Sequence, residues 1–256
     1  MNFLRIFTVS DIHIDYNENK KWLFDLSNID YKEDLLILAG DISSRMQSII
    51  KAFVALKSRF KEVLFIPGNH DLWVDRKNNT RNSLDNFYLI KTIAHNCGIV
   101  MEPVHFGSLS IIPLFGWYDY SFGQPPEIIY DMWLDFTACE WPDGYDEVSI
   151  TKNFIKMNEP FLNCSNNSII SFSHFLPRID VMPSYIPHDK RILYPVLGTA
   201  LLEKQIRQLG SKIHIYGHSH VNARVKLDNI EYINNAYGYP SEKIITAKKL
   251  LRIYDI

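Results

Sequence analysis

The chain has 256 residues, 46% of them hydrophobic, and its 27 basic and 29 acidic side chains leave a formal net charge of −2. This length and composition predict a single domain over residues 1–256 with one sizeable buried core. The weak net charge, without a long run of either sign, argues against a broad surface for nucleic acid or another polyanion, but it does not exclude a local phosphate site.

Three short apolar runs and one helical pattern fill the first quarter of the chain. Near-continuous apolar runs are typical of central strands that are covered on both faces. The runs are LRIFTVS (residues 4–10), DLLILAG (residues 34–40) and EVLFIPG (residues 62–68). Between the second and third runs, Met46, Ile49 and Phe53 recur at helical spacing. The order strand, helix, strand indicates a parallel α/β sheet.

The later part of the chain continues this alternation. Leu202, Ile206 and Leu209 share one face of a predicted helix that Gly210 closes. The predicted helices are residues 82–96 and 198–210, and the predicted strands are residues 108–117, 168–173, 211–216 and 249–256, with a hairpin over residues 223–234 that turns at Asp228 and Asn229.

Residues 116–163 form an irregular segment, rich in aromatic side chains, prolines and acids, without a clean period. Such a long insertion is either a functional loop or lid, or a packed excursion with a small aromatic core of its own. The same alternatives apply to Trp117, Tyr118 and Tyr120, which follow a predicted strand and either stack on a ligand or pack internally.

Most of the strand-like runs end in residues that can bind metal. One HxH pair, such as His218 and His220, is weak evidence for a metal site. However, five of the nine histidines follow strands, and ligands of open α/β sheets bind where the carboxyl ends of strands meet. The strand-end residues are Asp11, His13, Asp41, Asn69, His70, Asp71, His174, His218 and His220. We therefore expect these distant clusters to share one site.

These residue types favour two metal ions over one, because they exceed the needs of a single tetrahedral site. A carboxylate can bridge two cations, and such a pair orients a phosphate, neutralises its charge and supplies a hydroxide nucleophile at neutral pH. The mixture of nitrogen and oxygen ligands suits manganese, iron, zinc, cobalt or nickel. The glycines before Asp41, Asn69 and His218 allow the main chain to turn tightly there.

The ordered motifs DIH, GD, GNHD, a lone SH and GHSH, spanning residues 11–220, resemble the calcineurin-like metallophosphoesterase superfamily. The resemblance implies an α/β fold, a four-layer αββα sandwich in which two mixed β-sheets are flanked by helices. It also implies a dinuclear, metal-dependent phosphoesterase that uses metal-bound hydroxide as its nucleophile. A binding or scaffolding protein of the same fold, without turnover, is the alternative.

The resemblance also assigns roles to single residues. It places the first cation on Asp11, His13, Asp41 and His220. It places the second on Asp41, Asn69, His174 and His218, so that Asp41 is the bridge. In addition, it implies that His70 stabilises the transition state or protonates the leaving oxygen, and that Asp71 orients the imidazole of His70.

Differences between these motifs and those of two branches of the family narrow the expected class of substrate. GDISSRM and GNHD stand where protein Ser/Thr phosphatases carry GDYVDRG and GNHE, and His70 stands where lipid A precursor hydrolases carry arginine. We therefore expect a small phosphomonoester, phosphodiester or nucleotide as the substrate. Arg178, close to His174 in sequence, is the candidate cation for its phosphate.

Cysteine use and hydropathy indicate a soluble, cytoplasmic protein without a membrane partner. Cys97, Cys139 and Cys164 are far apart and form no CxxC pair, which favours reduced thiols. No signal peptide pattern and no run of eighteen apolar residues is evident. The sequence does not indicate the oligomeric state.

Overall fold

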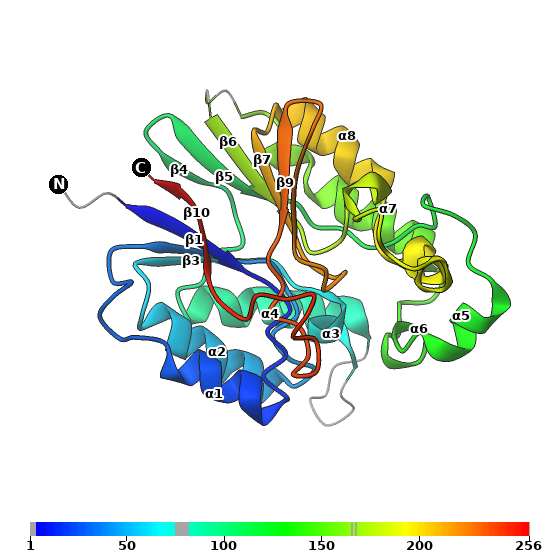
Figure 1. The fold of residues 1–256 in the computed structure, drawn as a ribbon, viewed down its shortest axis with the longest axis horizontal. Helices are drawn as coiled ribbons and strands as arrows, with labels where there is room; N and C mark the ends of the chain where they lie inside the picture. Colours follow the sequence, from blue (N-terminus) through cyan, green and yellow to red (C-terminus); the bar gives the residue numbers. More distant parts are fainter. Residues whose placement is uncertain (1–3, 75–81, 165, 167, 256) are drawn as a thin grey trace.

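Two β-sheets lie at the centre of the computed structural model, which describes residues 4–74, 82–164, 166 and 168–255 (Figure 1). The first sheet has the strand order β10-β1-β2-β3. Its strands are β1 (Arg5–Val9), β2 (Leu35–Leu38), β3 (Glu62–Phe65) and β10 (Leu251–Asp255). β1, β2 and β3 pair in parallel, and β10 pairs antiparallel with β1.

The second sheet has the order β4-β5-β6-β7-β9-β8. Its strands are β4 (Val104–Phe106), β5 (Leu109–Pro113), β6 (Ser168–Phe172), β7 (Ile213–Tyr216), β8 (Ala223–Leu227) and β9 (Ile230–Asn234). The four central strands are parallel, and β4 and β8 form antiparallel edges.

Helices cover the outer face of each sheet, which gives the predicted four layers (Figure 1). The first sheet is covered by α1 (Asn17–Asp25), α2 (Met46–Lys57) and α4 (Ser83–Asn96), and the second by α7 (Glu147–Met157) and α8 (Ala200–Leu209). The predicted αββα sandwich of two mixed sheets is therefore confirmed.

Apolar periodicity explains why the predicted helices form. In α8, Leu202, Ile206 and Leu209 are buried, the Thr199 hydroxyl accepts the N–H of Leu201, and Gly210 ends the helix at φ 68°. These are the N-cap and C-cap arrangements that stabilise helix ends.

The strand-end loops and the irregular segment contain elements that the sequence did not reveal. The short helix α3 (Asn69–Leu72) follows β3, and the 3₁₀ helices η2 (Glu159–Phe161), η3 (Ile179–Val181) and η4 (His188–Val196) lie between strands. The segment from 116 to 163 forms α5 (Glu127–Met132), α6 (Asp135–Ala138) and α7.

The two aromatic side chains that open this segment pack internally. Trp117 and Tyr118 are 0% and 1% exposed and stack on one another with ring centroids 5.0 Å apart. They therefore belong to the core and not to a ligand-binding face. Ile256, at the end of the last predicted strand, lies outside the described residues. Within the described ranges, no helix is long and apolar enough to cross a membrane.

Candidate metal centre

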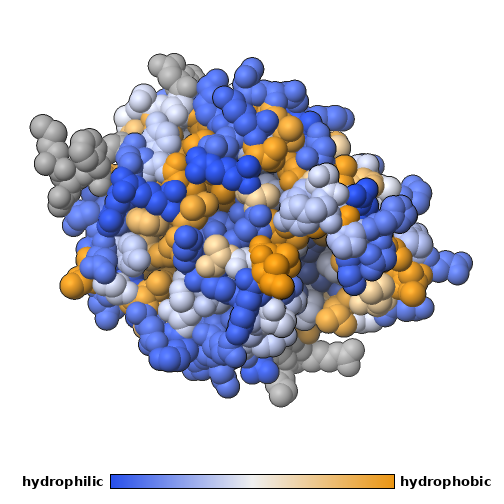
Figure 2. Space-filling model, in the orientation of Figure 1, coloured by the Kyte–Doolittle hydropathy of each residue, from blue (hydrophilic) through white to orange (hydrophobic). Residues whose placement is uncertain are grey.

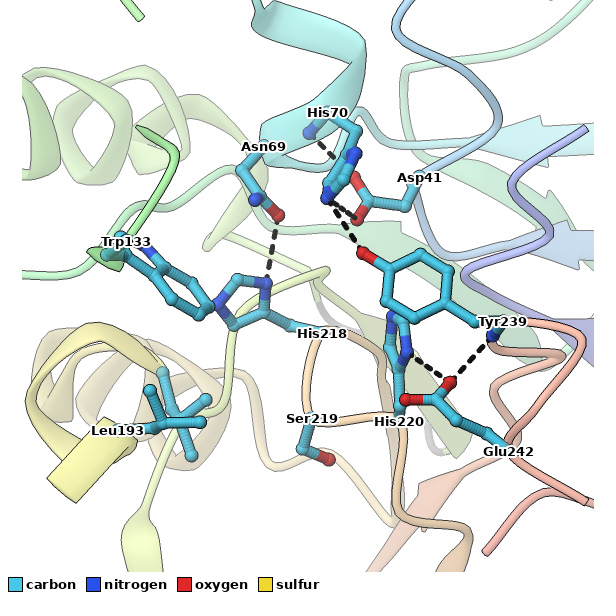
Figure 3. A pocket seen from close by; sticks show the side chains of 11 residues that line it. Asp41, Asn69, His70, Trp133, Leu193, His218, Ser219, His220, Tyr239 and Glu242 are labelled. Atoms are coloured by element: carbon cyan, nitrogen blue, oxygen red, sulfur yellow. Dashed lines mark hydrogen bonds and ion pairs between the residues drawn. The ribbon is translucent and has the colours of Figure 1, made fainter. Parts of the chain in front are cut away.

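Loops after β1, β2, β3, β6 and β7 bring seven of the predicted site residues together. Four of them line the pocket drawn in Figure 3, and the other three cluster with these four behind it. All seven are buried, with at most 8% exposure. They are Asp11, His13, Asp41, Asn69, His174, His218 and His220.

The first cluster consists of Asp11, His13, Asp41 and His220, whose ligand atoms all lie within 4.8 Å of one another. The Nε2 atom of His220 lies 3.1 Å from Nε2 of His13 and 3.2 Å from Oδ1 of Asp11. Oδ2 of Asp41 lies 3.8 Å from Nε2 of His13. Nitrogen and oxygen lone pairs thus face a common point.

The second cluster consists of Asp41, His174 and His218, with the amide of Asn69 beside it. Oδ1 of Asn69 lies 2.9 Å from Nδ1 of His218 and 3.1 Å from Nε2 of His174. Oδ2 of Asp41 lies 3.6 Å from the same His174 nitrogen. Asp41 is therefore common to both clusters.

Hydrogen bonds on the far side of each imidazole fix which nitrogen carries the proton. His174 Nδ1 lies 2.8 Å from the carbonyl of Ala39, and His218 Nε2 lies 3.0 Å from that of Val196. Because a carbonyl only accepts, each of these nitrogens donates, and the other ring nitrogen presents a lone pair. These two lone pairs and Oδ1 of Asn69 point toward one another, and no donor lies between them. A cation can bind in such an arrangement of acceptors.

Glu242 accepts a hydrogen bond from the far side of the His220 imidazole. Its Oε2 accepts from Nδ1 of His220 at 2.7 Å, and Nε2 of the same ring faces Asp11 (Figure 3). A carboxylate in this position both orients a ligating imidazole and raises its basicity. The donor set of both clusters therefore fits a pair of divalent cations.

The buried carboxylates of the pocket favour the binding of positive charge. Burial raises the pKa of Asp41, and the carboxylates of Asp11 and Asp71 raise it further. Burial opposes protonation of His220, yet Asp11 and Glu242 raise its pKa to about 9. Burial lowers the pKa of His218 well below its usual value, which leaves that imidazole neutral. Buried carboxylates that repel one another are stabilised by cations.

Five of the clustered residues have left-handed backbone conformations, which cost energy for residues other than glycine. They are Asp11 (φ 53°), His13 (φ 37°), Asp41 (φ 57°), His218 (φ 66°) and His220 (φ 53°). Glycine is also required next to this cluster, where a side chain would clash with the candidate ligands. A Cβ atom on Gly68 would lie 2.1 Å from Oδ1 of Asp41.

His70 lies at the edge of the clusters. Its ring stacks on the indole of Trp73, with centroids 3.8 Å apart, and its Nε2 lies 3.3 Å from the hydroxyl of Tyr239 and 3.9 Å from Oδ2 of Asp41. Burial, together with the imidazoles of His220 and His174, lowers the pKa of His70 to about 3. The imidazole is thus neutral near pH 7 and can donate through one ring N–H.

Asp71 does not orient His70, in contrast to the expectation from the resemblance. Its carboxylate accepts four backbone N–H groups at 2.8 to 3.2 Å, which uses the capacity of both oxygens. The donors are Asp41, Ile42, Ser43 and Gly68. Asp71 therefore ties the loop after β2 to the turn after β3.

Arg178 lies outside the pocket, so the expectation that it contacts the substrate phosphate is not supported. Its guanidinium pairs with Asp180 at 2.5 Å, Asp228 at 3.0 Å and Glu203 at 3.3 Å. It lines a separate cavity with Phe122. Three carboxylates already neutralise this cation.

Several pocket residues were missed by the sequence analysis because no motif contains them. Tyr239 and Glu242 follow the last motif by some twenty residues, and Trp133 and Asp135 lie in the irregular segment. The many aromatic and acidic residues of that segment were the feature that could have indicated a binding surface. Composition alone, however, does not distinguish Trp133 from Trp117, which is buried in the core.

Comparisons of the sequence with known proteins found two matches. The model of the calcineurin-like phosphoesterase family matches residues 4–222. The [acyl-carrier-protein] phosphodiesterase PptH of Mycobacterium tuberculosis is 24% identical over 93% of this chain and 78% of its own length.

Solved structures show the same fold. The crystal structure of phosphopantetheinyl hydrolase (PptH) from Mycobacterium tuberculosis superposes with a TM-score of 0.82 at 20% identity, covering 98% of this chain and 96% of that one. GAP50, the anchor in the inner membrane complex of Plasmodium, has a TM-score of 0.50 at 10% identity, covering 100% and 78%.

Proposed function

This chain belongs to the calcineurin-like phosphoesterase family and is a phosphoric ester hydrolase, and we propose that it hydrolyses the phosphodiester that links a phosphopantetheinyl group to a carrier protein. The substrate in this proposal comes from the relative PptH, whose name describes it as an acyl-carrier-protein phosphodiesterase. The proposal narrows the expected class of small phosphate esters to one kind of diester.

The observation that carries the catalytic part of the proposal is the carboxylate of Asp41, which belongs to both clusters. We propose that Asp11, His13, Asp41 and His220 hold one divalent cation and that Asp41, Asn69, His174 and His218 hold a second. Two cations so placed neutralise the charge of a phosphate and lower the pKa of water, which provides a nucleophile at neutral pH.

The remaining side chains position the imidazole of His70. Trp73 supports one face of the ring, and the hydroxyl of Tyr239 lies beside Nε2. We propose that His70 donates a hydrogen bond to the oxygen that leaves, which stabilises the negative charge that this oxygen gains.

The test is to incubate metal-reconstituted protein with a phosphopantetheinylated carrier protein and to follow the intact mass of the carrier. The carrier should lose the phosphopantetheinyl group, and the Asp41→Asn variant should leave it intact. A carrier of unchanged mass, with rapid hydrolysis of small monoesters, would contradict the proposed substrate. Absence of turnover on any ester, with both cations bound, would favour the scaffolding alternative.

A further inference from the structure

A second cavity opens beside the pocket that holds the candidate ligands. It has a volume of about 160 Å³, and the first has about 190 Å³. Both are lined by Asn69, His70, Trp133 and Tyr239, so they are continuous around these side chains. A phosphodiester carries two organic arms, and two connected cavities offer a place for each.

The two cavities differ in chemistry. Asp41, His218 and His220 line only the first, whereas Trp73, Met132 and Leu134 line only the second. The phosphate therefore belongs to the first cavity, where we have placed the cations. Among the described residues that line the second cavity there is no lysine or arginine.

Among the described residues of the second cavity's wall, Asp135 contributes the one carboxylate, and hydrogen bonds occupy its oxygens. Oδ1 accepts from Nδ2 of Asn69 at 2.8 Å and from Nε1 of Trp73 at 2.7 Å, and Oδ2 accepts from Nε1 of Trp133 at 2.9 Å. Asp135 is 2% exposed. It therefore holds both indole rings in place and leaves an apolar wall.

His70 stands between the two cavities. Asp41 lies on one side of its imidazole, at 3.9 Å, and Trp73 stacks against one face of the ring. In an in-line displacement the leaving oxygen departs on the side opposite the nucleophile. An oxygen that leaves a phosphate beside Asp41 and accepts a hydrogen bond from His70 therefore leads its organic group toward Trp73.

Exposed apolar side chains extend this cavity to the surface. Met132 and Leu134, at 53% and 60% exposure, continue into Ile128 and Tyr130 on α5. Figure 2 shows hydrophobic surface at the end of the molecule where Figure 1 places α5 and α6. Exposed apolar patches mark interaction sites, and these four exposed side chains all lie within residues 128–134.

Among the described residues beside this cavity, the charges on α5 are acidic. Residues 92–151 contain no lysine or arginine, and Glu127 and Asp131 lie on α5 among the exposed apolar residues. An alcohol with apolar neighbours would gain burial against Met132 and Leu134.

We propose that the cavity formed by Trp73, Met132, Trp133 and Leu134 is the leaving-group subsite, and that it takes the hydroxyl-bearing segment of a protein whose neighbouring side chains are apolar. This inference rests on the proposed phosphodiesterase function and specifies which side of the diester the apolar wall contacts.

The test uses two synthetic peptides with the same alkyl phosphodiester on a central serine, which is followed by leucine in one and by aspartate in the other. Partial burial of one leucine is worth about 1.4 kcal/mol, or about tenfold in rate. The wild-type protein should therefore show a kcat/KM about tenfold higher for the leucine peptide.

The variant Met132→Glu/Leu134→Glu should reduce this preference to about twofold or less. Ile29→Glu is the matched control, because Ile29 is 77% exposed and precedes β2 on a different part of the surface; it should keep the full preference. Binding of the unmodified leucine peptide to metal-free protein, followed by tryptophan fluorescence, should weaken in the double variant and not in the control.

Equal rates for both peptides in the wild type, or an unchanged preference in the double variant, would overturn the subsite and leave the phosphodiesterase function standing. Failure of the wild type to cleave either peptide or a phosphopantetheinylated carrier would instead remove the proposed function, and this inference with it.

Discussion

The imidazole of His70 contacts the site without belonging to either cluster of candidate ligands. Because it is placed to donate to the departing oxygen, its loss should matter most when that oxygen is a poor leaving group. His70→Asn should slow alkyl phosphodiesters by about 10²–10⁴-fold and activated aryl diesters much less. The measurement is kcat for a series of diesters that differ in the pKa of the leaving alcohol.

The metal content of the His70→Asn variant is the control for that series, and it should equal that of the wild type. An equal loss of rate across the series would show that His70 stabilises the phosphoryl group as a whole. Loss of a bound cation would show that His70 is a ligand.

At the scale of residues, the motifs identified the side chains that converge, but neighbours in sequence were a poor guide to partners. Asp71 follows His70, yet its oxygens face backbone amides some thirty residues earlier in the chain. Arg178 is close to His174 in sequence, yet its guanidinium pairs with Asp228. Such pairings depend on how distant loops pack, which local patterns do not encode.

The loop after β3 depends on the absence of a side chain at Gly68. A Cβ there would lie 2.1 Å from Asp41 and 2.6 Å from the ring of His174. Gly68→Ala should therefore displace both side chains and lower the affinity for divalent cations by at least about tenfold, in the range expected for a disturbed ligand shell. Calorimetric titration of the metal-free variant measures this.

Gly107→Ala provides the comparison, since Gly107 also sits in a turn but a Cβ would meet nothing within 4 Å. Its φ of 59° makes alanine cost about 1 kcal/mol of stability. This variant should keep wild-type metal affinity. Equal metal binding by both variants would contradict the close packing at Gly68.

In β7, His214 is fully buried between two hydroxyl groups, with Nδ1 2.8 Å from Ser171 and Nε2 3.0 Å from Ser173. Burial lowers its pKa from 6.5 to about 3. The unfolded chain therefore binds a proton that the folded state rejects, and stability present above pH 6.5 is lost as the pH falls toward 3.

Urea unfolding of metal-free protein between pH 7 and pH 5 tests this contribution. The free energy of unfolding of the wild type should fall more steeply with acidification than that of His214→Gln, by up to about 1.4 kcal/mol per pH unit. Parallel curves for the two proteins would show that His214 takes up a proton without cost in the folded state.

At the scale of elements, the central strands and α8 were predictable because their apolar patterns are long and unbroken. Several of the elements that the sequence did not reveal are short, although α7 has 11 residues and α1 has 9. α6 has four residues, and hydrogen bonds from Asn69, Trp73 and Trp133 to Asp135 hold its start. Its position is set by tertiary contacts, which leave no periodic signal.

Across the whole molecule, the site arises because loops from both sheets meet. The loops after β1, β2 and β3 supply Asp11, Asp41 and Asn69, and the second sheet supplies His174 and His218. The rule that ligands bind at the carboxyl ends of strands predicted this gathering. The sequence did not predict the order of strands within each sheet. It also did not predict that Tyr239 and Glu242, which lie beyond β9, line the pocket.

The number of divalent cations bound per chain tests the central claim most directly. Elemental analysis of reconstituted, dialysed protein should give two ions for the wild type. Asp34→Asn, a buried carboxylate that pairs with Arg5, should also keep two. In Asp41→Asn the loss of the shared carboxylate should weaken both sites and leave fewer than one ion per chain. A wild type that holds a single ion, or an Asp41→Asn variant that retains two, would contradict a two-cation centre bridged by Asp41.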